Sequence, residues 1–214
     1  MSIRNGFNAS LHNLHLDVVE MASLVEYSID ETILALQQNN RALAQKVVAE
    51  DDKIDKMERI VENQCIHLIA TQQPLAKELR RLMSILKMMT DFERIADHAA
   101  DICELLLELT GEGYVKPLKD IAEMAVMARN MVKNATDAYI NDDITMAVQI
   151  SATDSSVDDY FDTVVADLQE MMRKNPAQIK QATTLIFIAK HVEKIGDHAT
   201  NLGELVSCMI SGKK

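Results

Sequence analysis

An internal repeat narrows the folds open to this chain more than any other feature. The segment ERIADHAAD at 93–101 returns as EKIGDHATN at 193–201, an offset of 100 residues. The preceding segments align at an offset of 103, which places residues 157–158 (VD) over residues 54–55 (ID). A repeat that fills most of the 214 residues predicts two copies of one structural unit.

Each copy is predicted to contain three helices. The chain has 13 Met and many Ala, Leu and Glu residues but only 6 Gly and 3 Pro, which favours helix over sheet. Turn formers separate the helical segments, and short loops make neighbouring helices antiparallel. The predicted helices span 8–38, 42–71 and 76–109 in the first copy and 117–140, 143–173 and 177–210 in the second.

The predicted fold is therefore all-α, with six long helices in two tandem, pseudo-symmetric three-helix bundles. The first bundle would span 1–112 and the second 113–214, joined at the segment LTGEGYVKP (109–117), which contains two Gly and one Pro. The third helix of each copy carries apolar residues at alternating intervals of three and four, the pattern of a bundle core. These residues are Ile85, Met88, Phe92, Ile95, Ala99, Ile102 and Leu106, and Leu185, Ile188, Val192, Ile195, Ala199, Leu202 and Val206.

Carboxylates border this apolar stripe. Two of them stand four residues apart on the third helix, a spacing at which like charges repel each other. Two more, again four apart, come level with them when the second helix folds back at the turn near Pro74, and the second copy repeats the arrangement at Pro176. The predicted clusters are Asp51, Asp55, Glu93 and Asp97 in the first copy, and Asp154, Asp158, Glu193 and Asp197 in the second.

Four carboxylates at one place need a counter-charge or bound protons. Ligands that are all oxygen atoms select hard cations such as magnesium, calcium, manganese or ferric iron. The alternative is an ordinary solvated acidic face, since the chain contains 33 Asp and Glu residues. Recurrence of all four positions in the second copy favours a metal site.

The polar residues beside the motif are given lesser roles. His98 and His198 follow the carboxylates by one residue and point away from the facing helix, so we expect them in structural hydrogen bonds or at an interface. Asp101 and its counterpart Asn201 can serve as outer ligands only.

Composition excludes several classes of function. The net charge of −11 argues against nucleic acid as a partner and suits cations or basic protein surfaces. The 3 Cys residues form neither a disulfide nor a zinc pattern, which favours a reducing compartment. No apolar run reaches the length of a membrane span, so a cytosolic protein without membrane insertion is predicted. Neither a nucleophile triad nor a Gly-rich phosphate loop is present, and we expect no catalytic activity.

These strings resemble the PhoU family of bacterial phosphate-uptake regulators over nearly the whole chain. The resemblance rests on DDKIDKME (51–58), ATQQPLAKELR (70–80), DFERIADHAADI (91–102) and HVEKIGDHATNL (191–202). The chain departs from the family at Ala96, where the family favours Gly, although the second copy keeps Gly196. The extra methyl group is expected to shift the helix packing of the first bundle slightly.

The resemblance implies a cytoplasmic, often dimeric negative regulator without catalytic activity. Such a protein links a phosphate ABC transporter, through its ATPase subunit, to a phosphate sensor kinase. Some members carry multinuclear iron or zinc clusters on acid-x-x-x-acid pairs, which match the eight carboxylates named above. The metal identity stays open among iron, zinc, manganese and magnesium. Two alternatives also stay open: a carboxylate-bridged metalloenzyme, such as a phosphohydrolase or an iron oxidase, and a metal-free helical adaptor.

Overall fold

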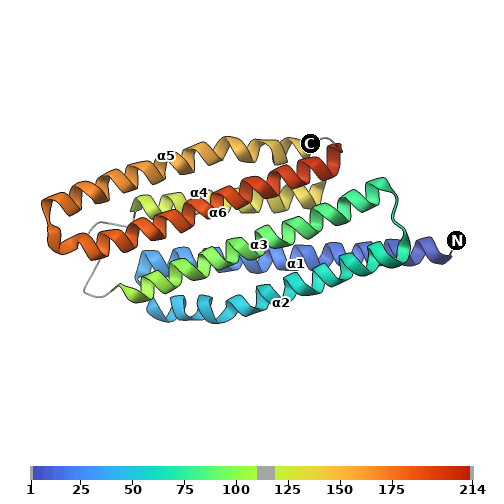
Figure 1. The fold of residues 1–214 in the computed structure, drawn as a ribbon, viewed down its shortest axis with the longest axis horizontal. Coiled ribbons are helices and arrows are strands. Elements are labelled where there is room, and N and C mark those ends of the chain that lie inside the picture. Colours follow the sequence, from blue (N-terminus) through green and yellow to red (C-terminus); the bar gives the residue numbers. More distant parts are fainter. Residues whose placement is uncertain (1, 110–118, 213–214) are drawn as a thin grey trace.

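The described part of the chain is almost entirely helical. The structure is a computed structural model that describes residues 2–109 and 119–212 (Figure 1). These residues contain no strand, and the predicted all-α fold with six long helices is confirmed. The elements are α1 (Ser2–Gln38), α2 (Arg41–Gln72), α3 (Ala76–Glu108), α4 (Lys119–Asn141), α5 (Ile144–Lys174), the short 3-10 helix η1 (Pro176–Gln178) and α6 (Ile179–Ser211).

One predicted helix boundary differs from the structure, and one predicted linker lies largely outside the described residues. Helix α1 begins six residues before the predicted start, because Gly6 does not interrupt it and Phe7 packs into the core with only 6% of its surface exposed. The joining segment is predicted at 109–117, and all of it except residue 109 lies outside the described residues. The predicted boundary between copies at 112/113 also lies outside them.

The repeat is visible in how the first turn of each copy is built. Asn39 directly follows α1 and Asp142 directly follows α4, and both of these residues have a positive φ, of 49° and 48°. The next residues, Asn40 and Asp143, cap the following helices by accepting a hydrogen bond from the backbone N–H three residues ahead. Each pair of equivalent residues is separated by 103 positions, as the sequence alignment predicted.

Helices α3 and α6 run side by side through the middle of the molecule, with α1 and α2 packed on α3 and α4 and α5 packed on α6 (Figure 1). Thirteen residues of α3 and twelve of α6 are buried, against six of α2 and five of α5, so the two central helices bury more than one face. All fourteen stripe residues are at most 2% exposed, which confirms the predicted core.

The two bundles share one continuous apolar core. A second contact joins them where α1 meets α4, and there Arg129 donates two parallel hydrogen bonds of 2.9 Å to the carboxylate of Asp30. None of the described helices has a stretch apolar and long enough to span a bilayer.

Candidate metal centre

In the first bundle, α2 and α3 bring three of the predicted carboxylates to one point. Asp51 and Asp55 lie one turn apart on α2 and face Asp97 on α3, and one oxygen atom from each lies within 4.8 Å of the others. Glu93 is outside this set. It stands one turn before Asp97 on α3, where burial, and then the charge of Asp97, raise its pKa. The first site therefore has three converging ligands and a fourth carboxylate displaced along the helix.

The electrostatics of this cluster leave it short of positive charge. Burial, followed by the charges of Asp97 and Asp55, raises the pKa of Asp51 to about 6. Burial is also the main cause of the raised pKa of Asp97. Arg94 is the one cation that pairs with these α3 carboxylates in the described chain, at 3.4 Å from Glu93 and 3.1 Å from Asp97. A bound cation would relieve the repulsion that remains.

The second bundle repeats the carboxylate arrangement but pairs its carboxylates with different cationic side chains. The pKa of Asp154 is raised by burial and then by Asp158 and Asp197. Lys194 pairs with Asp197, whereas the first copy has only one Arg for both of its α3 carboxylates. Lys190 similarly pairs with Glu193. The close triplet of the first copy does not recur among the described residues of the second.

One buried oxygen atom in the second cluster is suited to binding a cation. The hydroxyl of Thr200 lies near enough to the carboxyl of Asp154 to offset part of the rise that burial causes in its pKa, but no described residue completes a hydrogen bond to the buried Oδ1 atom. It faces Gly196 on α6, where an added Cβ would lie 3.4 Å from it, an ordinary contact distance. A buried carboxylate oxygen without a donor is costly unless a cation neutralises it.

The packing shift expected at Ala96 finds no support at the equivalent position of the second copy, because Gly196 has room for a methyl group.

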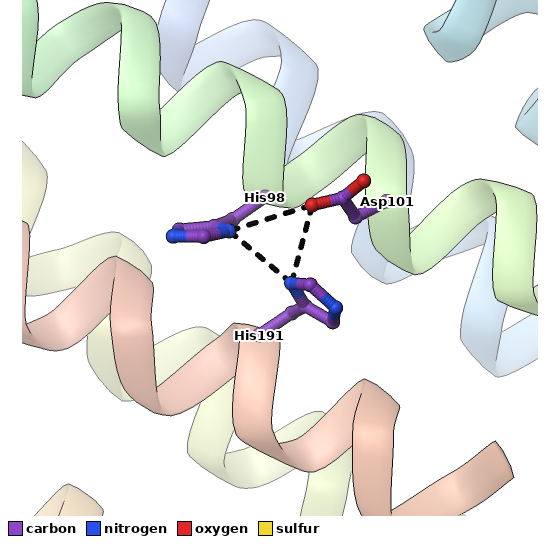
Figure 2. Close-up of side chains that lie close together, drawn as sticks. All are labelled: His98, Asp101 and His191. Carbon is purple, nitrogen blue, oxygen red and sulfur yellow. Dashed lines mark hydrogen bonds and ion pairs between the residues drawn. The ribbon is translucent and has the colours of Figure 1, made fainter.

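The predicted interface role of His98 and His198 is confirmed. Both side chains lie between α3 and α6, where Nδ1 of His198 is 2.8 Å from Oδ1 of Asp91. His98 contacts His191 and Asp101 (Figure 2). Burial, and then the neighbouring imidazoles, lower the pKa of His98. The neutral ring therefore dominates near neutral pH.

Sequence reasoning missed Asp91 and His191. The signal that could have found them is their repeat relationship, because the two positions are 100 residues apart like His98 and His198. Their residue types differ, so a search for identical residues passes over them. Asp101, expected as an outer ligand, lies near enough to the first cluster for its charge to contribute to the raised pKa of Asp97, and it also contacts the imidazoles of His98 and His191.

Comparison with protein-family models matches the PhoU domain twice, at residues 18–106 and 121–206. The chain belongs to the PhoU family. A relative from Clostridium acetobutylicum, a phosphate-specific transport system accessory protein PhoU homolog, is 33% identical over 99% of this chain and 97% of its own length. The Pseudomonas putida relative with the same description is 32% identical over 98% of this chain and 82% of its own length.

Solved PhoU structures have the same architecture. The crystal structure of PhoU from Pseudomonas aeruginosa superposes with a TM-score of 0.93, at 32% identity, over 97% of this chain and 100% of that one. The phosphate transport system regulatory protein PhoU from Streptococcus pneumoniae superposes with a TM-score of 0.90 over 97% of this chain and 98% of its own. At 23% identity this second match bears on the fold alone.

Proposed function

We propose that this PhoU-family protein is a non-catalytic accessory regulator of phosphate uptake that acts on a phosphate ABC transporter. The observation that carries the proposal is the match of both repeats to the PhoU domain, together with full-length relatives described as accessory proteins of phosphate-specific transport. In finer terms, the protein acts in the cytoplasm as a homodimer and negative regulator, and links the transporter ATPase subunit to a sensor kinase. The net charge of −11 supports docking on basic protein surfaces.

Gene deletion tests this role. In phosphate-rich medium, loss of the gene should derepress a reporter of phosphate-starvation genes and disturb the uptake of labelled phosphate. A plasmid copy of the wild-type gene should restore both. Unchanged reporter expression and uptake in the deletion strain would contradict the proposal and strengthen the metalloenzyme alternative, for which turnover of phosphoesters and of ferrous iron should then be measured.

We further propose that the carboxylate clusters bind cations. Asp51, Asp55 and Asp97, with Glu93 beside them, form the first site, and the second comprises Asp154, Asp158, Glu193 and Asp197. Support comes from the raised pKa of Asp51 and from the unpaired buried oxygen of Asp154. The first site should bind more tightly, because its α3 carboxylates share one Arg whereas the α6 carboxylates each have a Lys.

Elemental analysis of protein purified without a His tag tests the metal proposal and identifies the ion among iron, zinc, manganese and magnesium. At least one metal ion per chain is expected, and fewer in Asp97→Asn. The metalloenzyme alternative would need a substrate pocket at these ligands. The cleft of about 720 Å³ between α3, α5 and α6 is lined by none of the eight carboxylates, so this cleft does not supply such a pocket.

A further inference from the structure

Three side chains from the two bundles converge where α3 crosses α6. Nδ1 of His98 on α3 lies 3.2 Å from Nδ1 of His191 on α6 (Figure 2). Oδ2 of Asp101, one turn along α3 from His98, lies 3.3 Å from Nδ1 of His191 and 3.6 Å from Nδ1 of His98. The three atoms thus form a nearly equilateral triangle.

This triangle has the dimensions of a zinc coordination shell. Bonds of about 2.0–2.1 Å in a tetrahedral site place neighbouring ligand atoms about 3.3 Å apart. Two imidazole nitrogens select zinc and similar transition ions over magnesium or calcium, which prefer oxygen. We propose that His98, Asp101 and His191 form a binding site for a divalent transition-metal ion, with Zn²⁺ the best fit, that ties the first bundle to the second. This site does not depend on the proposed role in phosphate uptake.

The exposure of the three side chains allows an ion to enter. The side chain of His98 is 18% exposed and that of His191 is 26% exposed, whereas Asp101 is 46% exposed. The nitrogen ligands are therefore held by the packed helices, and the carboxylate side is open to solvent. Three protein ligands leave a fourth position for water or for a group from a partner.

The repeat supplies a second copy of this contact that lacks the same ligands. The equivalent residues are His198 and Asn201 on α6 and Asp91 on α3. Oδ1 of Asp91 accepts a hydrogen bond from Nδ2 of Asn201 at 3.3 Å and lies 2.8 Å from Nδ1 of His198. One imidazole and one carboxylate satisfy each other here. The second contact therefore serves as an internal control for the first.

A metal-free arrangement of the first set also exists in principle. One imidazole N–H would donate to the other ring, and Asp101 would accept from whichever ring carries the proton. This arrangement needs no ion and makes different predictions for variants. Asp101→Asn keeps the shape and the hydrogen-bonding capacity of the side chain but removes the anionic ligand.

The test is zinc binding to the full-length chain. Protein without a His tag is stripped with a chelator, and Zn²⁺ affinity is measured with excess Mg²⁺ present to occupy the oxygen-only clusters. X-ray absorption of the protein loaded with one equivalent of Zn²⁺ should show the multiple scattering of two imidazoles. His191→Gln, His98→Gln and Asp101→Asn should each weaken Zn²⁺ binding by at least about 100-fold, since loss of an outer-shell partner alone costs 10- to 100-fold. The ring of His198 lies 5.6 Å from that of His98, but its Nδ1 is held by Asp91, so His198→Gln should weaken Zn²⁺ binding far less than His191→Gln does.

Circular dichroism checks that each variant folds. If a histidine variant does not fold, the nearly isosteric Asp101→Asn variant still provides the test. The proposal is overturned if wild-type protein shows no imidazole scattering, or if His191→Gln and His198→Gln change the Zn²⁺ affinity equally. A reciprocal variant adds a gain of binding. Asp91→His combined with Asn201→Asp gives the second contact the composition of the first, and a second nitrogen-ligated Zn²⁺ per chain is expected. Failure of these results would leave the phosphate reporter experiment unaffected.

Discussion

Asp97 is the residue at which the charge of the first carboxylate cluster can be changed with almost no change in shape. Without metal, Asp97→Asn relieves repulsion with Asp55 and Asp51, so we expect a stability gain of up to about 1 kcal/mol. With the binding cation in excess, the variant should be less stable than wild type, because wild type gains about 2.7 kcal/mol at a hundredfold excess over Kd. Urea unfolding of both proteins, with and without the cation, measures the sign of the change in the free energy of unfolding in each condition.

Asp197→Asn is the matched control in the second bundle. Both carboxylates have a cationic neighbour, but Lys194 pairs with Asp197 while Lys190 pairs with Glu193, whereas Arg94 is shared between Asp97 and Glu93. Asp197→Asn therefore removes more attraction than Asp97→Asn does. We expect a smaller gain in the metal-free state than for Asp97→Asn, and no effect on metal bound at the first site. Equal gains at the two positions would contradict the assigned difference in charge compensation.

The pKa of Asp51 makes a prediction for the pH dependence of the metal-free protein. Its folded-state pKa is raised from 3.8 to about 6, so between these values the folded state holds more protons than the unfolded state. The contribution of Asp51 to stability is then greatest below pH about 4 and is lost as the pH rises through about 6. Asp51→Asn should flatten this slope in urea unfolding series. An unchanged slope would assign the effect to other groups.

At the level of single residues, the sequence predicts carboxylates well and imidazole partners poorly. Acid-x-x-x-acid spacing puts two carboxylates on one helix face whatever the surroundings, so Asp51, Asp55 and Asp97 could be placed together. Glu93 is offset because level positions on two long helices are fixed only to within about one turn by the loop between them. His191 could not be assigned to His98, since the contact joins different bundles.

Helices α5 and α6 approach closely at Gly203. An added Cβ there would lie 2.8 Å from the carbonyl oxygen of Ala147 and 3.0 Å from Cδ1 of Ile150. Because a backbone oxygen cannot swing away as a side chain can, Gly203→Ala must push the helices apart. We expect a loss of about 1–3 kcal/mol, the usual cost of overpacking, seen as a lower Tm in thermal unfolding.

Gly196→Ala on the same helix is the control for Gly203→Ala. An added Cβ at this position meets its neighbours at 3.4 Å or more, and the first copy already has Ala96 there. The substitution should be neutral or slightly stabilising, because Ala favours helix over Gly by about 1 kcal/mol. A similar loss of Tm in both variants would show that helix spacing is not the cause.

The elements themselves could be predicted because each signal is local. Turn residues and their capping side chains end the helices at Asn39 and Asp142, and the alternating spacing of three and four identifies the buried stripe of α3 and α6. The predicted start of α1 at residue 8 is six residues too late, because the helix runs through Gly6 and the side chain of Phe7 is buried in the core. Burial of that kind depends on tertiary contacts that the local pattern does not contain.

For the molecule as a whole, the contact between α3 and α6 decides how the two halves behave alone. Expressed separately, 1–112 and 113–214 should each be strongly helical by circular dichroism, because each has its own three-helix core. Each half would also expose the face that α3 or α6 buries against the other bundle. We therefore expect self-association in size-exclusion chromatography with light scattering. Two unfolded halves would instead indicate one continuous bundle.

This larger-scale packing lies beyond what periodicity can predict. The pattern identifies which helix faces are apolar but not which partner covers each face, and α3 must bury a second face to contact α6. Two independent bundles linked by a hinge and two bundles sharing one core have the same sequence signature. The hydrogen bonds from Arg129 to Asp30 add a polar contact between the two bundles to this shared core.

His98 contacts position 191, and its repeat equivalent His198 contacts position 91. This reciprocal pattern is that of an isologous dimer interface, but here both sides belong to one chain. In a true homodimer every substitution appears on both sides of the axis, so the two halves of the interface must stay chemically identical. When both copies lie in one chain, each can be substituted independently, so the two sides need not stay identical. One side of this contact has a second imidazole at position 191 where the other has a carboxylate at position 91, so the two sides can bind different ligands.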